Sequence, residues 1–154
     1  MTQEEPPLII ESRWDIPFRH TAGRLASHFF RALQEKRILA LRCPRCRRVL
    51  LPPRPFCERC FVLTDEWVPL EDTGTLDTFT IVYEQFLGMP PPPYCVGMIT
   101  LDGADTALMH YVSGVDLSDL EKAKQNVHVG MKVQAVWKEE REGRISDIRH
   151  FKPA

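Results

Sequence analysis

The sequence lacks a hydrophobic run long enough to cross a membrane, which takes roughly 18 consecutive apolar residues. It also lacks a basic start followed by an apolar stretch, because its first residues read Met-Thr-Gln-Glu-Glu-Pro-Pro. We therefore expect no membrane span and no signal peptide, and we expect the protein in the cytoplasm. In that reducing compartment, paired cysteines indicate metal binding rather than disulfides.

A strong net charge is also missing. The 20 lysines and arginines and the 21 aspartates and glutamates leave a formal net charge of -1, so any polyanion would have to bind a local patch. The composition, with 44% hydrophobic and 27% charged residues, is typical of a soluble globular protein. A chain of 154 residues is too short for two large enzymatic domains.

No group of residues has the pattern of a catalytic site. Cys95 lies in the apolar run Tyr94-Cys-Val-Gly-Met-Ile with no histidine nearby in sequence, so we expect a buried, inert thiol rather than a nucleophile. The aspartates fall at turns or helix starts, where capping is the usual explanation. The histidines show no ligand spacing, and they are His20, His28, His110, His128 and His150. We predict no catalytic residue in this chain.

Four of the five cysteines, in contrast, form two Cys-x-x-Cys pairs, Cys43 with Cys46 and Cys57 with Cys60. This spacing lets two sulfurs from one tight turn point at the same ion, and four tetrahedral thiolates suit zinc. Ten residues separate the pairs, which is enough for two short strands to bring the turns together. We predict a structural Zn²⁺ with a closed shell, which supplies much of the folding free energy of this segment. The same cage accepts iron, which would make the protein a redox carrier instead.

Periodicity predicts the remaining elements. An extended arm containing Trp14, Ile16 and Phe18 precedes a helix from Thr21 to about Arg37, which must dock on this chain or on another subunit. Five β-rich segments and a short helix follow, in the order of an OB-type barrel. The strands are expected at residues 75–83, 94–101, 106–112, 132–138 and 144–151, and the helix at 117–125.

The predicted fold class is thus mainly β with an N-terminal helix. We expect a rubredoxin-like zinc ribbon followed by a five-stranded OB-fold barrel. The expected boundaries are 1–37 for the arm and helix, 38–66 for the ribbon and 67–154 for the barrel.

This order resembles a known family, the acyl-CoA-associated proteins with a rubredoxin-like zinc ribbon and an OB fold, which form domain-of-unknown-function family thirty-five. The specific segments are Arg42-Cys-Pro-Arg-Cys and Pro52-Pro-Arg-Pro-Phe-Cys-Glu-Arg-Cys, and the likeness runs from about Arg24 to Phe151. Many such turns place glycine after the second cysteine, but here Arg47 and Phe61 occupy those positions, so we expect the turns to accommodate a side chain. The missing glycine after Cys46 departs from the usual family pattern without changing a ligand.

The resemblance implies a non-catalytic subunit of a thiolase-superfamily complex. Such a complex acts on acyl-CoA, for example by thiolytic cleavage of a β-oxoacyl-CoA in aromatic or fatty-acid degradation. The partner in this hetero-oligomer carries the catalytic residues. The present subunit helps to form the CoA channel and stabilises the partner.

Six arginines crowd the ribbon segment, which makes a CoA thioester a candidate ligand. The planar guanidinium group binds phosphate oxygens in pairs, and we assign Arg47, Arg48 and Arg54 tentatively to the CoA phosphates. A solvated rim or salt bridges to a partner would explain these arginines equally well.

Nucleic acid is the competing polyanion, because zinc ribbons and OB barrels both occur in its binders. Phe79, Tyr83 and Tyr111 could stack bases. The near-zero net charge and the barrel strands, which are not conspicuously basic, oppose this alternative.

Overall fold

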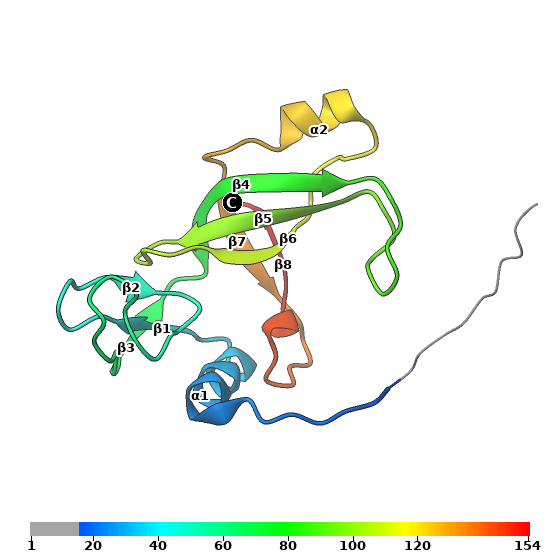
Figure 1. Ribbon diagram of the computed structural model, residues 1–154. Helices are drawn as coiled ribbons and strands as arrows, with labels where there is room; N and C mark the ends of the chain where they lie inside the picture. The colour runs from blue at the N-terminus through cyan, green and yellow to red at the C-terminus, as the bar shows by residue number, and fades with distance from the viewer. Residues whose placement is uncertain (1–15) are drawn as a thin grey trace, which may run out of the picture.

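The structure is a computed structural model that describes residues 16–154. A helix leads into a small three-stranded sheet, which is followed by a five-stranded barrel (Figure 1). Trp14 of the expected arm lies outside the described residues, and Ile16 and Phe18 are exposed to solvent. No helix within residues 16–154 is long and apolar enough to cross a membrane.

The N-terminal helix, α1, spans Gly23–Gln34. The sequence predicted that it would continue to about Arg37, but Lys36 adopts a left-handed φ of 57° and ends the helix. The apolar side of α1 buries Phe29 and Leu33 in the core of this chain. The helix therefore docks on its own chain, which the sequence had left open.

Three antiparallel strands form the ribbon sheet in the order β2-β1-β3. Their bounds are Ile38–Arg42 for β1, Val49–Leu50 for β2 and Glu66–Leu70 for β3. The sequence did not predict β3, because its apolar residues do not alternate: every residue is half-buried except Pro69, which is exposed. This strand pairs with β1 along its whole length and leads directly into the barrel.

The barrel closes in the order β4-β5-β6-β8-β7, with the helix α2 between its third and fourth strands in chain order, β6 and β7. The expected fold class is confirmed. In Figure 1, α2 lies beyond β4, away from the ribbon. The seam between β6 and β8 is a single parallel pair, Val112 with Phe151. The elements are β4 (Thr73–Val82), β5 (Tyr94–Leu101), β6 (Leu108–Val112), α2 (Leu120–Asn126), β7 (Lys132–Trp137) and β8 (Ile148–Pro153).

The last strand differs from the prediction, which placed it at residues 144–151. A 3-10 turn, η1 (Ile145–Asp147), precedes β8. The turn forms because the buried carboxylate of Asp147 accepts hydrogen bonds from the backbone N–H groups of residues 142–144 at 2.8 to 3.1 Å. Burial alone would raise the pKa of Asp147, but these donors outweigh it and hold the pKa below its usual range.

One hydrophobic core runs through helix, ribbon and barrel. Barrel residues such as Leu76, Ile99 and Phe151 belong to the same cluster as Phe29 of α1 and Leu51 beside β2. A second, small cluster consists of Leu50 and the buried cysteines Cys43 and Cys57. The ribbon is thus joined to the barrel by shared apolar packing, and only the surroundings of the cysteines form a core of their own.

Candidate metal centre

The two Cys-x-x-Cys turns have the same backbone structure. In the first turn, the N–H of Arg47 donates to the carbonyl of Cys43 at 3.0 Å, and in the second, the N–H of Phe61 donates to the carbonyl of Cys57 at 2.9 Å. Arg47 and Phe61 occupy equivalent positions, with left-handed φ values of 64° and 53°. The prediction that these turns accommodate a side chain where glycine is usual is confirmed.

The four sulfurs of the turns lie close enough to bind one ion. The Sγ atoms of Cys43, Cys46, Cys57 and Cys60 are all within 4.8 Å of one another. The Cys46 and Cys57 sulfurs are 3.7 Å apart, close to the edge of about 3.8 Å expected for a tetrahedron with Zn–S bonds of about 2.3 Å. The donor set therefore fits a four-coordinate thiophilic metal, and four protein ligands leave no position for water or substrate.

The electrostatics of the cysteines also fit a cation. Burial opposes ionisation of Cys43, but the backbone N–H groups of Cys46 and Arg45 outweigh it and lower the pKa of Cys43 to about 6. Burial, together with the neighbouring sulfurs, raises the pKa of Cys60 to about 12. Cys43 thus ionises easily while ionisation of Cys60 is suppressed, because two negative charges at this separation repel each other. A divalent ion between them would remove that conflict.

All three arginines assigned to the CoA phosphates form ion pairs inside the ribbon. Arg47 Nη1 lies 3.1 Å from Glu66 Oε2, Arg48 pairs with Glu58, and Arg54 Nη1 lies 3.6 Å from the other oxygen of Glu58. The hydrogen bond with Glu58 raises the pKa of Arg48, and the same contact lowers the pKa of Glu58. A phosphate would have to compete with these carboxylates, so CoA binding by the three arginines stays a prediction.

The metal centre itself changes the charge of the ribbon. Between residues 42 and 66, six arginines against Glu58, Asp65 and Glu66 leave a formal charge of +3. Four thiolates and one Zn²⁺ together carry a charge of -2, so the metal-bound ribbon carries only about +1. The arginines therefore largely balance the thiolates and the acidic residues around them. Arg45 and Arg59 are exposed and form no ion pair within residues 16–154.

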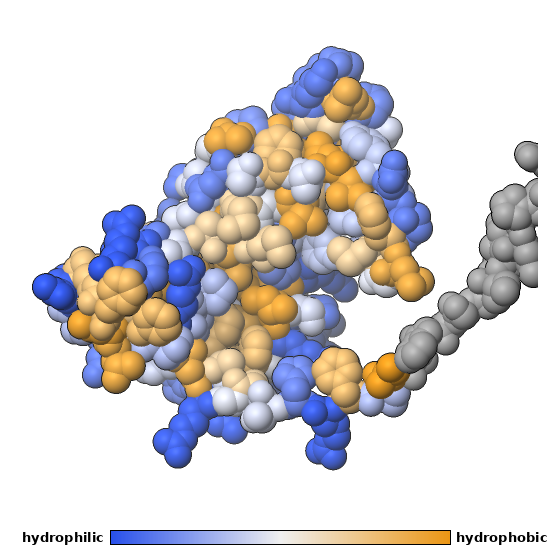
Figure 2. All heavy atoms as spheres, in the orientation of Figure 1, coloured by the Kyte–Doolittle hydropathy of each residue, from blue (hydrophilic) through white to orange (hydrophobic). Residues whose placement is uncertain are grey.

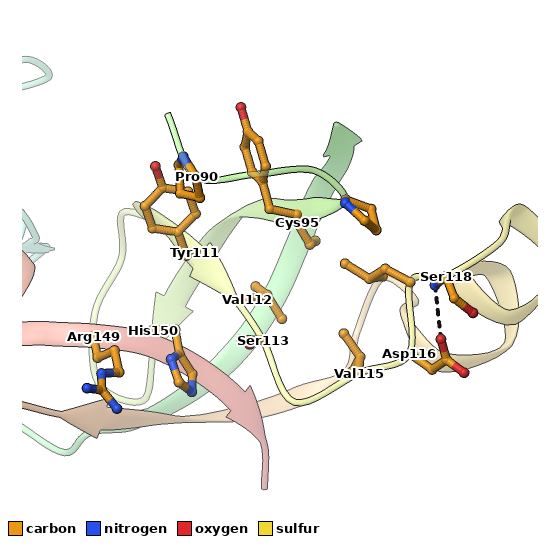
Figure 3. Close-up of a pocket in the computed structure, with 13 residues that line it drawn as sticks. Pro90, Cys95, Tyr111, Val112, Ser113, Val115, Asp116, Ser118, Arg149 and His150 are labelled. Atoms are coloured by element: carbon orange, nitrogen blue, oxygen red, sulfur yellow. Dashed lines mark hydrogen bonds between the residues drawn. The ribbon is translucent and has the colours of Figure 1, made fainter. Parts of the chain in front are cut away.

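The fifth cysteine lies in the barrel, apart from the metal ligands. Cys95 lines a hollow of about 510 Å³ at the seam of β6 and β8, together with Tyr111 and His150 (Figure 3). Its side chain is buried, and burial raises its pKa to about 11. The expectation of a buried thiol is confirmed, and at neutral pH this thiol is protonated.

The aromatic residues considered for base stacking do not line one surface. Phe79 and Tyr83 line a hollow between β4 and α2. Tyr111 lines the hollow of Figure 3, where its ring packs edge-on against Tyr94 with centroids 5.9 Å apart. The three rings therefore lie in two different hollows and do not form one row along which a nucleic-acid strand could run.

Sequence reasoning missed one feature of the second turn. Phe56 and Leu63 form a β-bridge beside the cysteines, and both side chains are exposed. Phe61 between them is also exposed. The sequence did contain a signal, because these three large apolar residues all lie in the eight-residue segment 56–63, which includes the second cysteine pair.

Comparison with known proteins shows that two family models match the ribbon and the barrel. Residues 30–66 match the family described as ChsH2, rubredoxin-like zinc ribbon domain, and residues 67–138 match the one described as ChsH2, C-terminal OB-fold domain. The two matches adjoin and follow the order of ribbon and barrel. The chain belongs to the ChsH2 family. The resemblance expected from the cysteine and proline segments is confirmed.

Two solved structures share this ChsH2 fold. One, described as an Ltp2-ChsH2(DUF35) aldolase, is 22% identical with a TM-score of 0.64, and the match covers 88% of this chain and 98% of that one. The other is a protein of unknown function from the DUF35 family of Sulfolobus solfataricus. It is 25% identical with a TM-score of 0.64, over 86% of this chain and 87% of that one.

A curated relative of this chain comes from Thermomonospora curvata and is described as a probable enoyl-CoA hydratase alpha subunit. It is 27% identical over an alignment of 127 residues, and the match covers 79% of this chain and 35% of the relative. The chain thus spans about a third of the length of that relative.

Proposed function

We propose that this chain is a non-catalytic, zinc-binding accessory subunit of a cytoplasmic acyl-CoA enzyme whose catalytic partner is a thiolase-superfamily protein. The observation that carries the proposal is the match of ribbon and barrel to the ChsH2 family over residues 30–138. Two similar proteins are described as a hydratase alpha subunit and as an aldolase that contains Ltp2 and ChsH2. Both descriptions name assemblies rather than a ChsH2 chain acting alone.

The described residues support an accessory role for this chain. The four cysteine sulfurs form a closed ligand set, so the metal they would hold supports the ribbon and does not activate water. The remaining thiol, Cys95, is buried with a raised pKa, which makes it a poor nucleophile. Acyl-CoA chemistry in the complex is therefore assigned to the partner. We propose the division into arm and helix, ribbon and barrel at residues 37/38 and 66/67 as the working description of this subunit, with β3, the third strand of the ribbon sheet, crossing the second boundary.

Co-purification tests the proposal directly. Tagged chain, recovered from native lysate at low salt, should bring down a thiolase-superfamily protein in near-stoichiometric amount, identified by mass spectrometry. The partner is then assayed for CoA-dependent cleavage of a β-oxoacyl-CoA, alone and with this chain. We expect the partner to be less active or less stable alone. Recovery of no such protein, or a partner that is equally active and stable without this chain, would overturn the proposal.

The same material decides between this function and nucleic-acid binding. A free nucleic-acid binder would bind a labelled single strand with an affinity that falls steeply with salt, in proportion to the phosphates contacted. We expect no such binding by the purified chain. The metal is identified in the same preparation by elemental analysis, where we expect one zinc per chain. An iron-loaded cage would also be coloured.

A further inference from the structure

The second cysteine turn carries two features that the fold itself does not require. Phe61 holds a left-handed φ of 53°, a conformation that favours glycine and costs free energy for a residue with a side chain. Its side chain is 83% exposed, so the phenyl ring gains almost no burial in return. A glycine at position 61 would relieve the backbone without loss of core packing. Neither the backbone nor the core of this chain therefore explains a phenylalanine at this position, and we look for the explanation in a contact with another molecule.

Phe61 is part of a larger exposed apolar tip. Leu63 is 75% exposed and Phe56 is 49% exposed, and these two residues form a β-bridge that places their side chains next to each other. Figure 2 shows apolar side chains gathered on the ribbon lobe with hydrophilic side chains around them. We call Phe56, Phe61 and Leu63 the ribbon tip. Large apolar side chains clustered in this way on a surface are typical of protein contacts.

The charges beside the ribbon tip indicate the chemistry of the contact. Arg59 immediately precedes Cys60 in the second turn, and Arg45 lies inside the first turn. Both are exposed and form no ion pair within the described part of the chain, whereas Arg47, Arg48 and Arg54 are paired with carboxylates. The sulfurs of the two turns lie within 4.8 Å of one another, so Arg45 and Arg59 belong to the same end of the ribbon as the tip. An apolar tip on a surface that also carries two arginines without an ion pair complements an apolar hollow with a carboxylate rim.

We infer that the ribbon tip is the anchor that docks this chain on its heterologous catalytic partner, in an apolar hollow whose rim carries Asp or Glu side chains facing Arg45 and Arg59. This inference rests on the proposed function and names the surface that serves it. A second copy of this chain fits the tip less well, because a two-fold contact through the tip would bring the free arginines of both copies together. Nucleic acid also fits less well, because the metal-bound ribbon carries only about +1.

The equivalence of the two turns provides a matched pair of variants. Phe61→Gly removes the anchor and relieves the left-handed backbone, while Arg47→Gly relieves the equivalent backbone in the first turn and leaves the tip intact. Both variants should keep their zinc and melt no lower than the wild-type chain. A loss of binding in F61G therefore cannot come from misfolding. Leu120→Ser, at an exposed apolar residue of α2 away from the ribbon, controls for loss of apolar surface in general.

The experiment measures the dissociation constant of full-length chain and purified partner by calorimetry or interferometry, without CoA, so that the predicted CoA contact of Arg47 does not affect the R47G control. We expect F61G and Leu63→Ser each to weaken binding by at least about 30-fold, and R47G and L120S to stay within about threefold of wild type. Arg59→Glu should slow association several-fold at low salt, and this effect should shrink at high salt.

Each other outcome overturns a specific statement. Equal binding by F61G and wild type overturns the anchor and leaves the accessory role intact. Wild-type chain that binds no thiolase-superfamily protein overturns the proposed function and this inference with it. Light scattering that shows a dimer of wild-type chain and a monomer of F61G would assign the tip to a second copy. Salt-sensitive binding of single-stranded DNA that F61G loses would assign it to nucleic acid.

Discussion

Val49 and Asp105 exchange two hydrogen bonds across the junction of ribbon and barrel. The N–H of Val49 donates to a carboxylate oxygen of Asp105 at 2.8 Å, and the N–H of Asp105 donates to the carbonyl of Val49 at 2.8 Å. Leu51 repeats this arrangement with the hydroxyl of Thr106, which accepts at 2.7 Å and donates at 2.8 Å. The outer edge of β2 is thus sealed by the loop before β6, and the ribbon is fixed on the barrel.

This junction predicts a large effect of Asp105→Ala on stability. The variant leaves the N–H of Val49, a buried residue, without its acceptor, which should cost about 1 to 3 kcal/mol in the free energy of unfolding. Urea denaturation followed by far-UV circular dichroism measures it. Asp65→Ala is the control, because Asp65 is exposed and makes no hydrogen bond within residues 16–154. A change in D105A no larger than that in D65A would contradict the structural role of Asp105.

Loss of the metal should destabilise the whole chain and not the ribbon alone. Val49 and Leu51 belong to the same core as the barrel, so an unfolded ribbon would expose barrel packing. We expect Cys57→Ser to lose zinc and to lower the melting temperature by more than about 10 °C, as should chelation of wild type. Cys95→Ala is the matched control and should keep one zinc per chain. Two separate transitions, with an unchanged barrel transition in C57S, would show that ribbon and barrel fold independently.

Asp147 should make the stability depend on pH in the acid range. Because its folded pKa lies below the usual carboxyl value of about 3.9, its contribution is present above that pH and is lost as the pH falls through the folded pKa. Asp147→Asn should therefore be less stable than wild type by about 1 to 3 kcal/mol at pH 7. The difference should shrink below about pH 4. A difference that stays constant from pH 3 to pH 7 would rule out the carboxylate as its source.

The CoA prediction for the arginines can be tested through Glu58. This residue pairs with both Arg48 and Arg54, so Glu58→Gln frees two guanidinium groups without removing an arginine. If these groups bind CoA phosphates, the affinity for CoA should rise several-fold in E58Q and fall in an Arg54→Gln variant. Calorimetry with CoA and with dephospho-CoA measures both changes. Identical affinities in E58Q, R54Q and wild type would show that the arginines serve the metal centre and the ribbon surface instead.

Local patterns in the sequence predicted most of the fold. The Cys-x-x-Cys pairs fixed the ribbon because two sulfurs per turn have few alternatives, and alternating apolar residues marked four of the five barrel strands closely. The spacing of Phe29 and Leu33 also predicted the buried side of α1. These features depend on neighbours close in the chain, and a single sequence records them directly.

The remaining features depend on contacts between distant residues. β3 has no clear period and becomes a strand because β1 offers it an edge. The sequence predicted a turn at Asp105 and the start of a strand at Thr106. Both residues in fact form hydrogen bonds with the edge of β2, more than 50 positions earlier in the chain. The ion pairs of Arg48 and Arg54 with Glu58 were also not predicted, because the alternative to CoA binding was a solvated rim or salt bridges to a partner. These ion pairs are close in the chain, but an arginine can contact any of several carboxylates or stay solvated, so the sequence alone does not show that the candidate phosphate-binding residues already have partners.

The single residue pair that joins β6 to β8 makes this seam the place where the barrel is expected to open locally. The seam consists of the pair Val112 and Phe151 and one hydrogen bond, from the N–H of Ser113 to the carbonyl of Phe151 at 2.8 Å. Every other pair of neighbouring strands in the barrel is joined by three or more residue pairs. The amide of Ser113 should therefore exchange with deuterium well before those in the middle of β5. When β6 and β8 separate, the hollow that Cys95 lines widens first, and the buried thiol becomes briefly accessible to solvent.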